Sequence, residues 1–206
     1  MRSVWWRRNR LWLALLVPLA LLAVAASSFR LVTLYLPWEW SRPVVAHGPA
    51  GTLRQSFDDL AGTRTTREVR VEVISIEAHE TYAKTKAAVG GTLWRAVLEF
   101  EAAPDQQLYG CEVELTDAAG TRYDFRSGLE PATEGDYFQA PILLPCVPED
   151  APGPTVEPLT GTSVPSPVQR PRTWREQVLI AMPEGVTPTG VRIGWSRPEY
   201  LVLQIP

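Results

Sequence analysis

The sequence predicts an all-β protein, an antiparallel β-sandwich preceded by one N-terminal transmembrane helix. Three observations lead to this prediction: about eight short segments with alternating apolar and polar residues, turn residues between them, and one long uncharged apolar run near the N-terminus. Alternation with period two is typical of half-buried strands. Because no amphipathic segment suits the helix of a βαβ unit, two antiparallel layers are favoured over a parallel sheet.

The composition limits the number of domains and the kinds of partner. A chain of 206 residues with a membrane segment leaves room for one ordinary domain. Residues 1–40 hold five Arg and one Glu, whereas residues 41–206 hold 15 Lys or Arg against 22 Asp or Glu. Such an acidic domain lacks the basic stripe that nucleic acids or anionic lipid surfaces select. We therefore expect neither as a partner of the soluble part.

The N-terminal region is typical of a signal anchor. Residues 1–10 contain four arginines and form a predicted cytoplasmic basic segment, and residues 11–36 form the predicted transmembrane helix. Leu11 to Phe29 is 19 residues without a charge. As a helix this run is roughly 28 Å long, close to the hydrocarbon thickness of a bilayer. The arginines place the N-terminus in the cytoplasm and the rest of the chain outside.

Cleavage of this segment as a signal peptide is the alternative to an anchor. Ala23-Val24-Ala25 supplies the small residues that signal peptidase needs. The apolar character continues to Leu36 past a single arginine, and tryptophans flank the run on both sides, which favours the uncleaved anchor. The predicted membrane-interface residues are Trp5, Trp6, Arg30, Trp38 and Trp40. In the competing interpretation of Trp38 and Trp40, these two side chains pack on the folded domain and not at the membrane interface.

Residues 37–66 and 67–206 are predicted to be a tether and an extracytoplasmic sandwich. The tether has scattered Pro and Gly and one short helical pattern at Leu53 to Leu60. In the sandwich, the alternating phase shifts at Ile74, which indicates a β-bulge. The predicted strands cover 69–76, 94–100, 109–115, 123–125, 137–144, 177–182, 191–195 and 200–205, with a hairpin turn at 117–120.

A Pro-rich loop is predicted at residues 147–173, because seven prolines lie between Pro148 and Pro171. Proline cannot donate to a strand ladder, so we expect a long exposed loop. The loop is interpreted either as a partner-binding segment or as a surface loop without a binding role, and the second interpretation is favoured.

Cys111 and Cys146 are the two cysteines of the chain, and both lie in the part predicted to be outside. An even count in an oxidising compartment predicts a disulfide between them. A pair of buried thiols is the alternative. A bridge would close a loop of about 35 residues and contribute on the order of 3–4 kcal/mol to stability.

No motif indicates catalysis, a metal or a cofactor. The pair His79-Glu80 lacks a second histidine at position 83, so the helical zinc-protease motif is absent. No serine lies in a nucleophile elbow, and no glycine loop for phosphate precedes a helix. We therefore expect no enzyme, with a hydrolase as the least favoured option.

Several segments resemble a known group of proteins. They are the strand REVRVEVISIE, the strand LWRAVLEFEA, the hairpin DAAGTRY and the late strand QVLIAMPEG, after a basic start and one apolar run. This pattern resembles membrane-anchored actinobacterial proteins with an extracytoplasmic immunoglobulin-like β-sandwich domain of unknown function. The resemblance covers residues 67–205 and implies an immunoglobulin-like fold without catalytic residues.

These observations favour a non-enzymatic, single-pass protein of the plasma membrane. Its outer sandwich is expected to bind another envelope or membrane protein, or to support a membrane complex. The alternative is a sensor or carrier domain for a small ligand or a metal. The residues that suggest this alternative are His79, Glu80, Cys146 and Met182.

Overall fold

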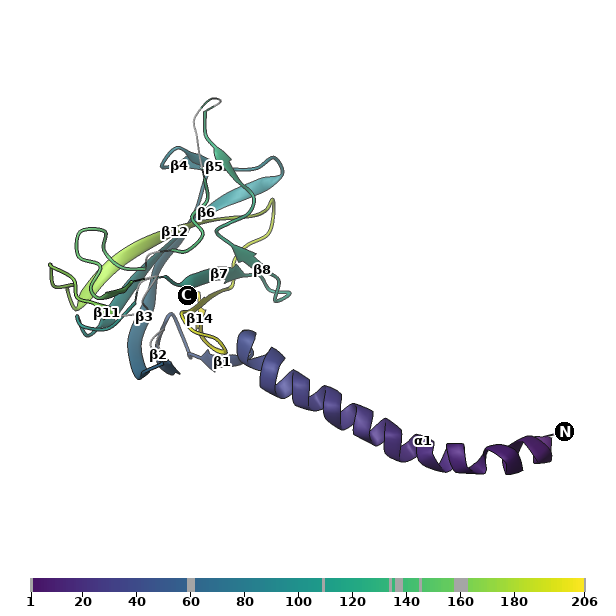
Figure 1. Ribbon diagram of the computed structural model, residues 1–206. Coiled ribbons are helices and arrows are strands. Elements are labelled where there is room, and N and C mark those ends of the chain that lie inside the picture. Colours follow the sequence, from purple (N-terminus) through teal and green to yellow (C-terminus); the bar gives the residue numbers. More distant parts are fainter. Residues whose placement is uncertain are drawn as a thin grey trace.

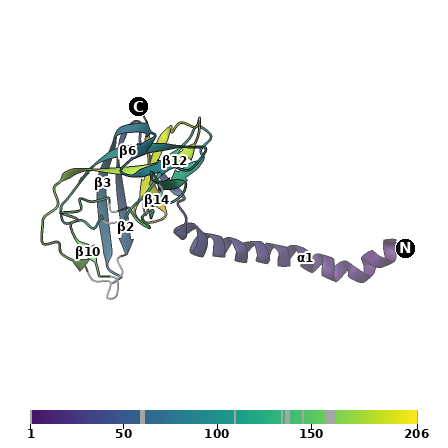
Figure 2. The ribbon, with the colours of Figure 1, turned by 90° about the horizontal axis from the view of Figure 1, so that it is seen from above.

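The computed structural model describes residues 2–58, 62–108, 110–133, 135, 139–144, 146–157 and 163–205, and it contains one long helix and a β-sandwich (Figure 1). Helix α1 (Arg2–Arg30) continues through a π-helical turn (Leu31–Tyr35) and a 3-10 turn (Leu36–Trp38). From both directions of view the helix extends away from the sandwich (Figures 1 and 2). One apolar N-terminal helix is therefore present, as the sequence predicts.

The first sheet has four antiparallel strands in the order β12, β6, β3, β2. Their bounds are β2 (Ala50–Asp58), β3 (Arg64–His79), β6 (Gly91–Ala102) and β12 (Thr173–Pro183). The register of β3 against β6 shifts between Val73 and Ser75. This irregularity confirms the β-bulge that the phase shift at Ile74 predicts, since an extra residue changes which side chains face the core.

The second sheet has five strands in the order β1, β14, β13, β7, β8. Their bounds are β1 (Arg42–Val45), β7 (Glu112–Thr116), β8 (Arg122–Asp124), β13 (Gly190–Gly194) and β14 (Glu199–Gln204). Strands β7 and β8 form the predicted hairpin, and among the strands that the structure describes only β1 pairs in parallel, with β14. Short strands complete the fold: β4 (Thr81–Tyr82), β5 (Thr85–Ala87) and β9 (Leu129–Pro131) in one sheet, and β10 (Thr155–Val156) with β11 (Ser163–Val164) in another.

The core lies between the two large sheets, where alternate side chains of each sheet meet. Phe100 of β6 stacks on Trp174 of β12 with ring centroids 5.6 Å apart, and Trp195 approaches the edge of the same ring. The two sheets thus form a mostly antiparallel β-sandwich with one shared core. Fully buried residues from the first sheet include Leu53, Val69, Val71, Ala96 and Ile180, and those from the second include Val113, Leu115, Val191, Ile193 and Leu201.

The predicted tether at 37–66 is wrong from Arg42 onward, because β1, β2 and the start of β3 lie within it. Leu53, which fits a short helical pattern, is instead a fully buried residue of β2. Pairing with β3 along the whole of β2 decides this outcome, since two turns of helix are unstable without tertiary contacts. The sandwich therefore begins at Arg42, and only residues 39–41 separate it from the helical turns.

The strand predicted at 137–144 is not formed in the residues that the structure describes there. Residues 136–138 lie outside the described part, and of residues 139–144 only Leu144 pairs, in a single bridge with Cys111. Residues 139–143 form a loop. Tyr109, at the start of another predicted strand, is also outside the described part.

The Pro-rich loop at 147–173 contacts the sandwich through buried side chains, of which Arg170 makes the polar contacts. The Arg170 guanidinium donates to the backbone oxygens of Ala103, Gln106 and Pro152 at 2.8–3.0 Å. It also lies 4.8 Å from the centre of the Trp174 ring. The described part of the loop is exposed at many positions, as predicted, but it is not free of the sandwich: Arg170 is buried, and β10 pairs with β11 inside the loop.

Candidate functional site

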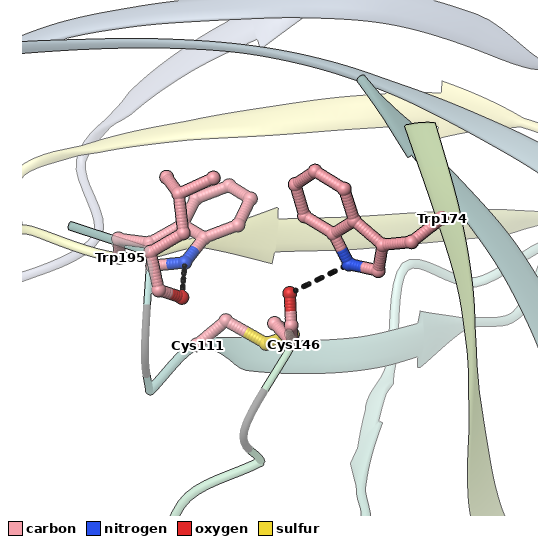
Figure 3. The surroundings of a disulfide bond; sticks show 5 residues. Cys111, Cys146, Trp174 and Trp195 are labelled. Carbon is pink, nitrogen blue, oxygen red and sulfur yellow. Dashed lines mark hydrogen bonds between the residues drawn. A yellow bond between two sulfur atoms is a disulfide. The ribbon is translucent and has the colours of Figure 1, made fainter. Parts of the chain in front are cut away.

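The two cysteines form a disulfide at one side of the core. Cys111 and Cys146 are bonded, with their Cα atoms 6.0 Å apart. Two indoles lie beside the bond (Figure 3): Trp174 Nε1–H donates to the Cys146 oxygen at 3.2 Å, and Trp195 Nε1–H donates to the Leu108 oxygen at 2.8 Å. The bridge, the Cys111–Leu144 pairing and these bonds fix the backbone on both sides of the disulfide.

The fixed loop presents two large apolar side chains to solvent. Ile142 is 78% exposed and Leu143 is 49% exposed, directly before the paired Leu144. Arg126 Nε–H donates to the Ile142 oxygen at 3.3 Å, which adds a second support for the loop. Apolar side chains held in place at the surface are a feature of protein contact sites.

A groove of about 910 Å³ lies between the C-terminal half of β2 and the turn that joins β13 to β14. We call it the helix-end groove, because the end of the N-terminal helix forms one wall. Gln55 of β2 crosses to the turn, where its amide donates to the oxygens of Ser196 at 2.6 Å and Glu199 at 2.8 Å. The groove is lined by Trp38, Trp40, Arg42, Arg54–Asp58, Arg64, Glu112 and Trp195–Glu199.

One buried polar side chain lines the groove, and a second lies behind its wall. Gln55 is 2% exposed, and within the described ranges its Oε1 atom has no donor. Buried Arg67 donates to the Gln107 oxygen at 2.9 Å and to Ser196 Oγ at 3.2 Å, and its guanidinium lies 4.2 Å from the centre of the Phe57 ring. No carboxylate of the described residues pairs with Arg67. Burial lowers its pKa to about 10, so it keeps its charge at neutral pH.

The helix end is fastened to the sandwich at the wall of the groove. Arg197 Nη1–H donates to the Trp38 oxygen at 3.0 Å, and Trp40 Nε1–H donates to Glu112 Oε2 at 2.6 Å. Trp40 also meets the edge of the Tyr200 ring at 6.2 Å. Trp40 therefore packs on the sandwich, as the competing interpretation of the sequence has it, whereas Trp38 remains 71% exposed.

The groove concentrates arginines on a domain that is acidic as a whole. Three of its four arginines pair with carboxylates: Arg54 with Glu68 at 2.6 Å, Arg64 with Asp58 at 3.3 Å and Arg197 with Glu112 at 3.3 Å. Arg42 forms no ion pair with any residue that the structure describes. Glu199, the register partner of Arg42 on β14, also lines the groove, so that Arg67 behind the wall gives the groove a small excess of positive charge.

The other residues singled out in the sequence do not form one site. Trp5 and Arg30 lie on the exposed helix, and the side chain of Trp6 is outside the described part. Cys146 is bonded to Cys111, and Met182 is buried in the core, so neither joins His79. Over the described ranges, no three His, Cys, Asp or Glu residues are grouped so as to hold a metal ion.

The sequence analysis does not single out Gln55 in the groove or Arg67 behind it, although a signal for both exists. Arg67 has the same strand phase as buried Val69 and Val71, and Gln55 has the same phase as buried Leu53. A polar residue in the inward phase of a strand marks either a buried hydrogen-bonding site or a break in the core.

Glu176 is a third polar residue in an inward phase, between buried Trp174 and Val178 on β12. It lines a small cavity of about 30 Å³ with Leu98, Phe100, Val113, Leu144, Cys146, Gln177 and Val178. Burial among these mostly apolar neighbours raises the pKa of Glu176 from 4.5 to about 7.

We predict that stability falls as the pH rises from about 4.5 to about 7. In this range the folded protein keeps the Glu176 proton that the unfolded chain releases, so ionisation favours unfolding. The expected loss is about 1–3 kcal/mol; below the range the full stability is present, and above it the loss persists without further change through this group. Denaturant unfolding at pH 5 and pH 8 measures it. Glu176→Gln should remove the difference, whereas Glu184→Gln at an exposed turn should not. An equal pH dependence in both variants would contradict the assignment.

Gly194 is predicted to be essential for the docking of Trp40. A Cβ atom at Gly194 would lie 2.6 Å from the Trp40 ring, far inside contact distance. Gly194→Ala should therefore displace the indole and lower the free energy of unfolding by about 1–3 kcal/mol. Gly48→Ala is the control, because nothing lies within 4 Å of its added Cβ. Similar stability of the two variants would show that Trp40 moves freely.

Comparison with known proteins adds little to this description. No family model matches the chain, and no curated protein is significantly similar to it. Among solved structures, the chain is similar to an uncharacterised β-sandwich protein from Clostridium difficile 630, with 12% sequence identity and a TM-score of 0.31. The match covers 82% of this chain and 96% of that one. At this TM-score the likeness supports no inference about function.

Proposed function

We propose that this protein is a non-enzymatic, single-pass protein of the plasma membrane whose outer β-sandwich binds another envelope or membrane protein. One observation carries the proposal. Over residues 8–35 the helix is apolar, and none of the residues in its most apolar stretch is buried against the sandwich. Such a surface is unfavourable in water and stable in a bilayer.

The length of the helix supports a membrane span. The 28 residues from Arg8 to Tyr35 are about 42 Å long as a helix, which is close to the 40–45 Å of a bilayer with its headgroups. Arg8 and Tyr35 would then lie near opposite surfaces. The basic residues before the span and the acidic sandwich after it favour a cytoplasmic N-terminus. The disulfide suits the oxidising side of the membrane.

Retention of the helix is favoured over cleavage after Ala25. The apolar span continues past this position to Tyr35, and the last helical turn is bonded to the sandwich through Arg197 and the Trp38 oxygen. In the proposal, these contacts hold the sandwich within a few residues of the bilayer surface.

The immunoglobulin-like type and the likeness to actinobacterial envelope proteins are part of the same proposal. Two packed sheets and a buried tryptophan beside a disulfide are features of immunoglobulin-like domains. Here the disulfide joins the start of β7 to a loop, which differs from the bridge between sheets found in antibody domains.

The loop with Ile142 and Leu143 is the proposed contact for the protein partner. Disulfide and backbone pairing hold this loop in place, so little conformational entropy is lost when the two side chains are covered. Chemical crosslinking in native membranes, followed by recovery of the full-length protein, identifies the partner.

The double variant Ile142→Ser/Leu143→Ser should lose the crosslinked partner. The matched control is Val89→Ser, which removes a fully exposed apolar side chain from the loop between β5 and β6. An identical set of crosslinked proteins for all three forms would contradict the proposed contact.

A small-ligand role is the second candidate function, and the helix-end groove is the observation that favours it. The groove combines aromatic and charged side chains over two buried polar residues, as ligand sites do.

A further inference from the structure

We infer that the helix-end groove binds the phosphate of an anionic phospholipid in the outer leaflet of the membrane. The inference rests on the proposed membrane anchor, and it assigns to the groove a partner that the acidic composition of the domain does not suggest.

The position of the groove is the first argument. Trp38 is the last residue of the helical turns and lines the groove with most of its side chain exposed. A span ending near Tyr35 places Trp38 at the level of the headgroups, where indoles are enriched. The mouth of the groove would then lie next to lipid phosphates.

The charge of the groove is the second argument. Arg42 is exposed and forms no ion pair in the described part of the chain, although Glu199 is its register partner on β14. Buried Arg67 adds a positive charge without a carboxylate beside it, directly behind Phe57 and Ser196. An unneutralised buried cation favours an anion in front of it, because the low dielectric of the interior screens the charge weakly.

The carboxylates of the groove do not prevent this binding. Asp58 is paired with Arg64, and Glu112 accepts from Trp40 and Arg197. Their charges are therefore compensated within the protein. Glu199 remains as an acidic group, so the groove suits a phosphate with one negative charge better than a highly charged polyanion.

The chemistry of arginine matches a phosphodiester. The guanidinium presents paired N–H donors that bind two phosphate oxygens at once. Arg42 and Arg64 lie on the rim of the groove and are exposed, so their side chains are accessible to a headgroup. The exposed Ser56 adds a hydroxyl on the same rim for the polar part of the headgroup.

Native mass spectrometry of the full-length protein in detergent tests the inference. The protein is offered phosphatidylglycerol or phosphatidylcholine with the same acyl chains, and the retained lipid is counted. The groove variant is Arg42→Gln/Arg64→Gln. The control variant is Arg122→Gln/Arg175→Gln, which removes the same charge from exposed positions on β8 and β12.

We expect retention of phosphatidylglycerol over phosphatidylcholine by the native protein and the control, and a loss of about tenfold or more in the groove variant. Equal retention of the two lipids, or equal loss in both variants, would overturn the inference. Displacement of phosphatidylglycerol by millimolar inorganic phosphate would assign the groove to a soluble anion instead. If the groove variant keeps its lipid but loses the crosslinked protein partner in native membranes, the groove is a protein contact and the inference is overturned.

The same spectra separate this inference from the proposed function. The mass of the protein shows whether residues 8–35 are retained, so a failed anchor is recognised independently of lipid binding. A retained helix with no preference for phosphatidylglycerol would refute the groove assignment alone.

Discussion

Arg170→Ala is expected to lower the free energy of unfolding by on the order of 3–5 kcal/mol. The substitution leaves the oxygens of Ala103, Gln106 and Pro152 without their donor and removes the side chain that covers Trp174. Gly153, with a φ of +75°, lies so close to this guanidinium that a Cβ would collide with it, so the loop is shaped around the arginine. Denaturant unfolding in detergent, followed by tryptophan fluorescence, measures the loss.

Two further variants make this prediction specific. Arg170→Lys keeps the charge but cannot reach three oxygens in different directions, and should recover little of the stability. Arg172→Ala removes an exposed neighbour and should change stability by less than about 0.5 kcal/mol. A small effect of Arg170→Ala, similar to that of Arg172→Ala, would show that the Pro-rich loop is not fixed by this side chain.

Removal of the disulfide is expected to cost about 3–4 kcal/mol. The bridge closes a segment with a sequence separation of 35, and its loss restores the conformational freedom of that segment in the unfolded chain. The double variant Cys111→Ser/Cys146→Ser avoids a remaining free thiol. Unfolding of the native protein with and without a reducing agent is the parallel measurement.

The variant and the reduced native protein should lose similar amounts of stability. The reducing agent should have no effect on the variant itself, which is the control for effects unrelated to the bridge. Unchanged stability in both cases would mean that the contacts of Trp174 and Leu144 hold this region without the disulfide.

Much of the fold can be predicted from the sequence, because the alternation of apolar residues records which face of each strand meets the core. Val69, Val71 and Val73 are all buried, and the change of phase after them corresponds to the bulge in β3. Hairpin β7–β8 follows from alternation around a turn containing Gly120, whose φ is +81°. These are local features, and local sequence determines them.

The elements that the sequence does not predict depend on distant contacts. Strand β2 has a weak pattern that suits a short helix equally well, and only its pairing with β3 makes it a strand. Strand β1 is short and exposed, and it is formed by parallel pairing with β14, more than 150 residues away in the chain. No local signal marks such a pairing.

The helix-end groove also depends on contacts between distant parts of the chain, so the sequence does not predict it. Each of its walls comes from a different part of the chain: the helix end, β2 and the turn between β13 and β14. The sequence shows polar residues in the inward phase at Gln55 and Arg67, but their neighbours are known only from the structure. Overall composition even points away from an anionic ligand, because the arginines are gathered at one place on an acidic domain.

The intact mass of the protein recovered from carbonate-washed native membranes tests the central claim most directly. Our account predicts that the protein remains in the membrane fraction and that residues 8–35 are still covalently joined to the sandwich. Recovery of the sandwich in the soluble fraction, with a mass lacking the residues up to Ala25, would contradict the account.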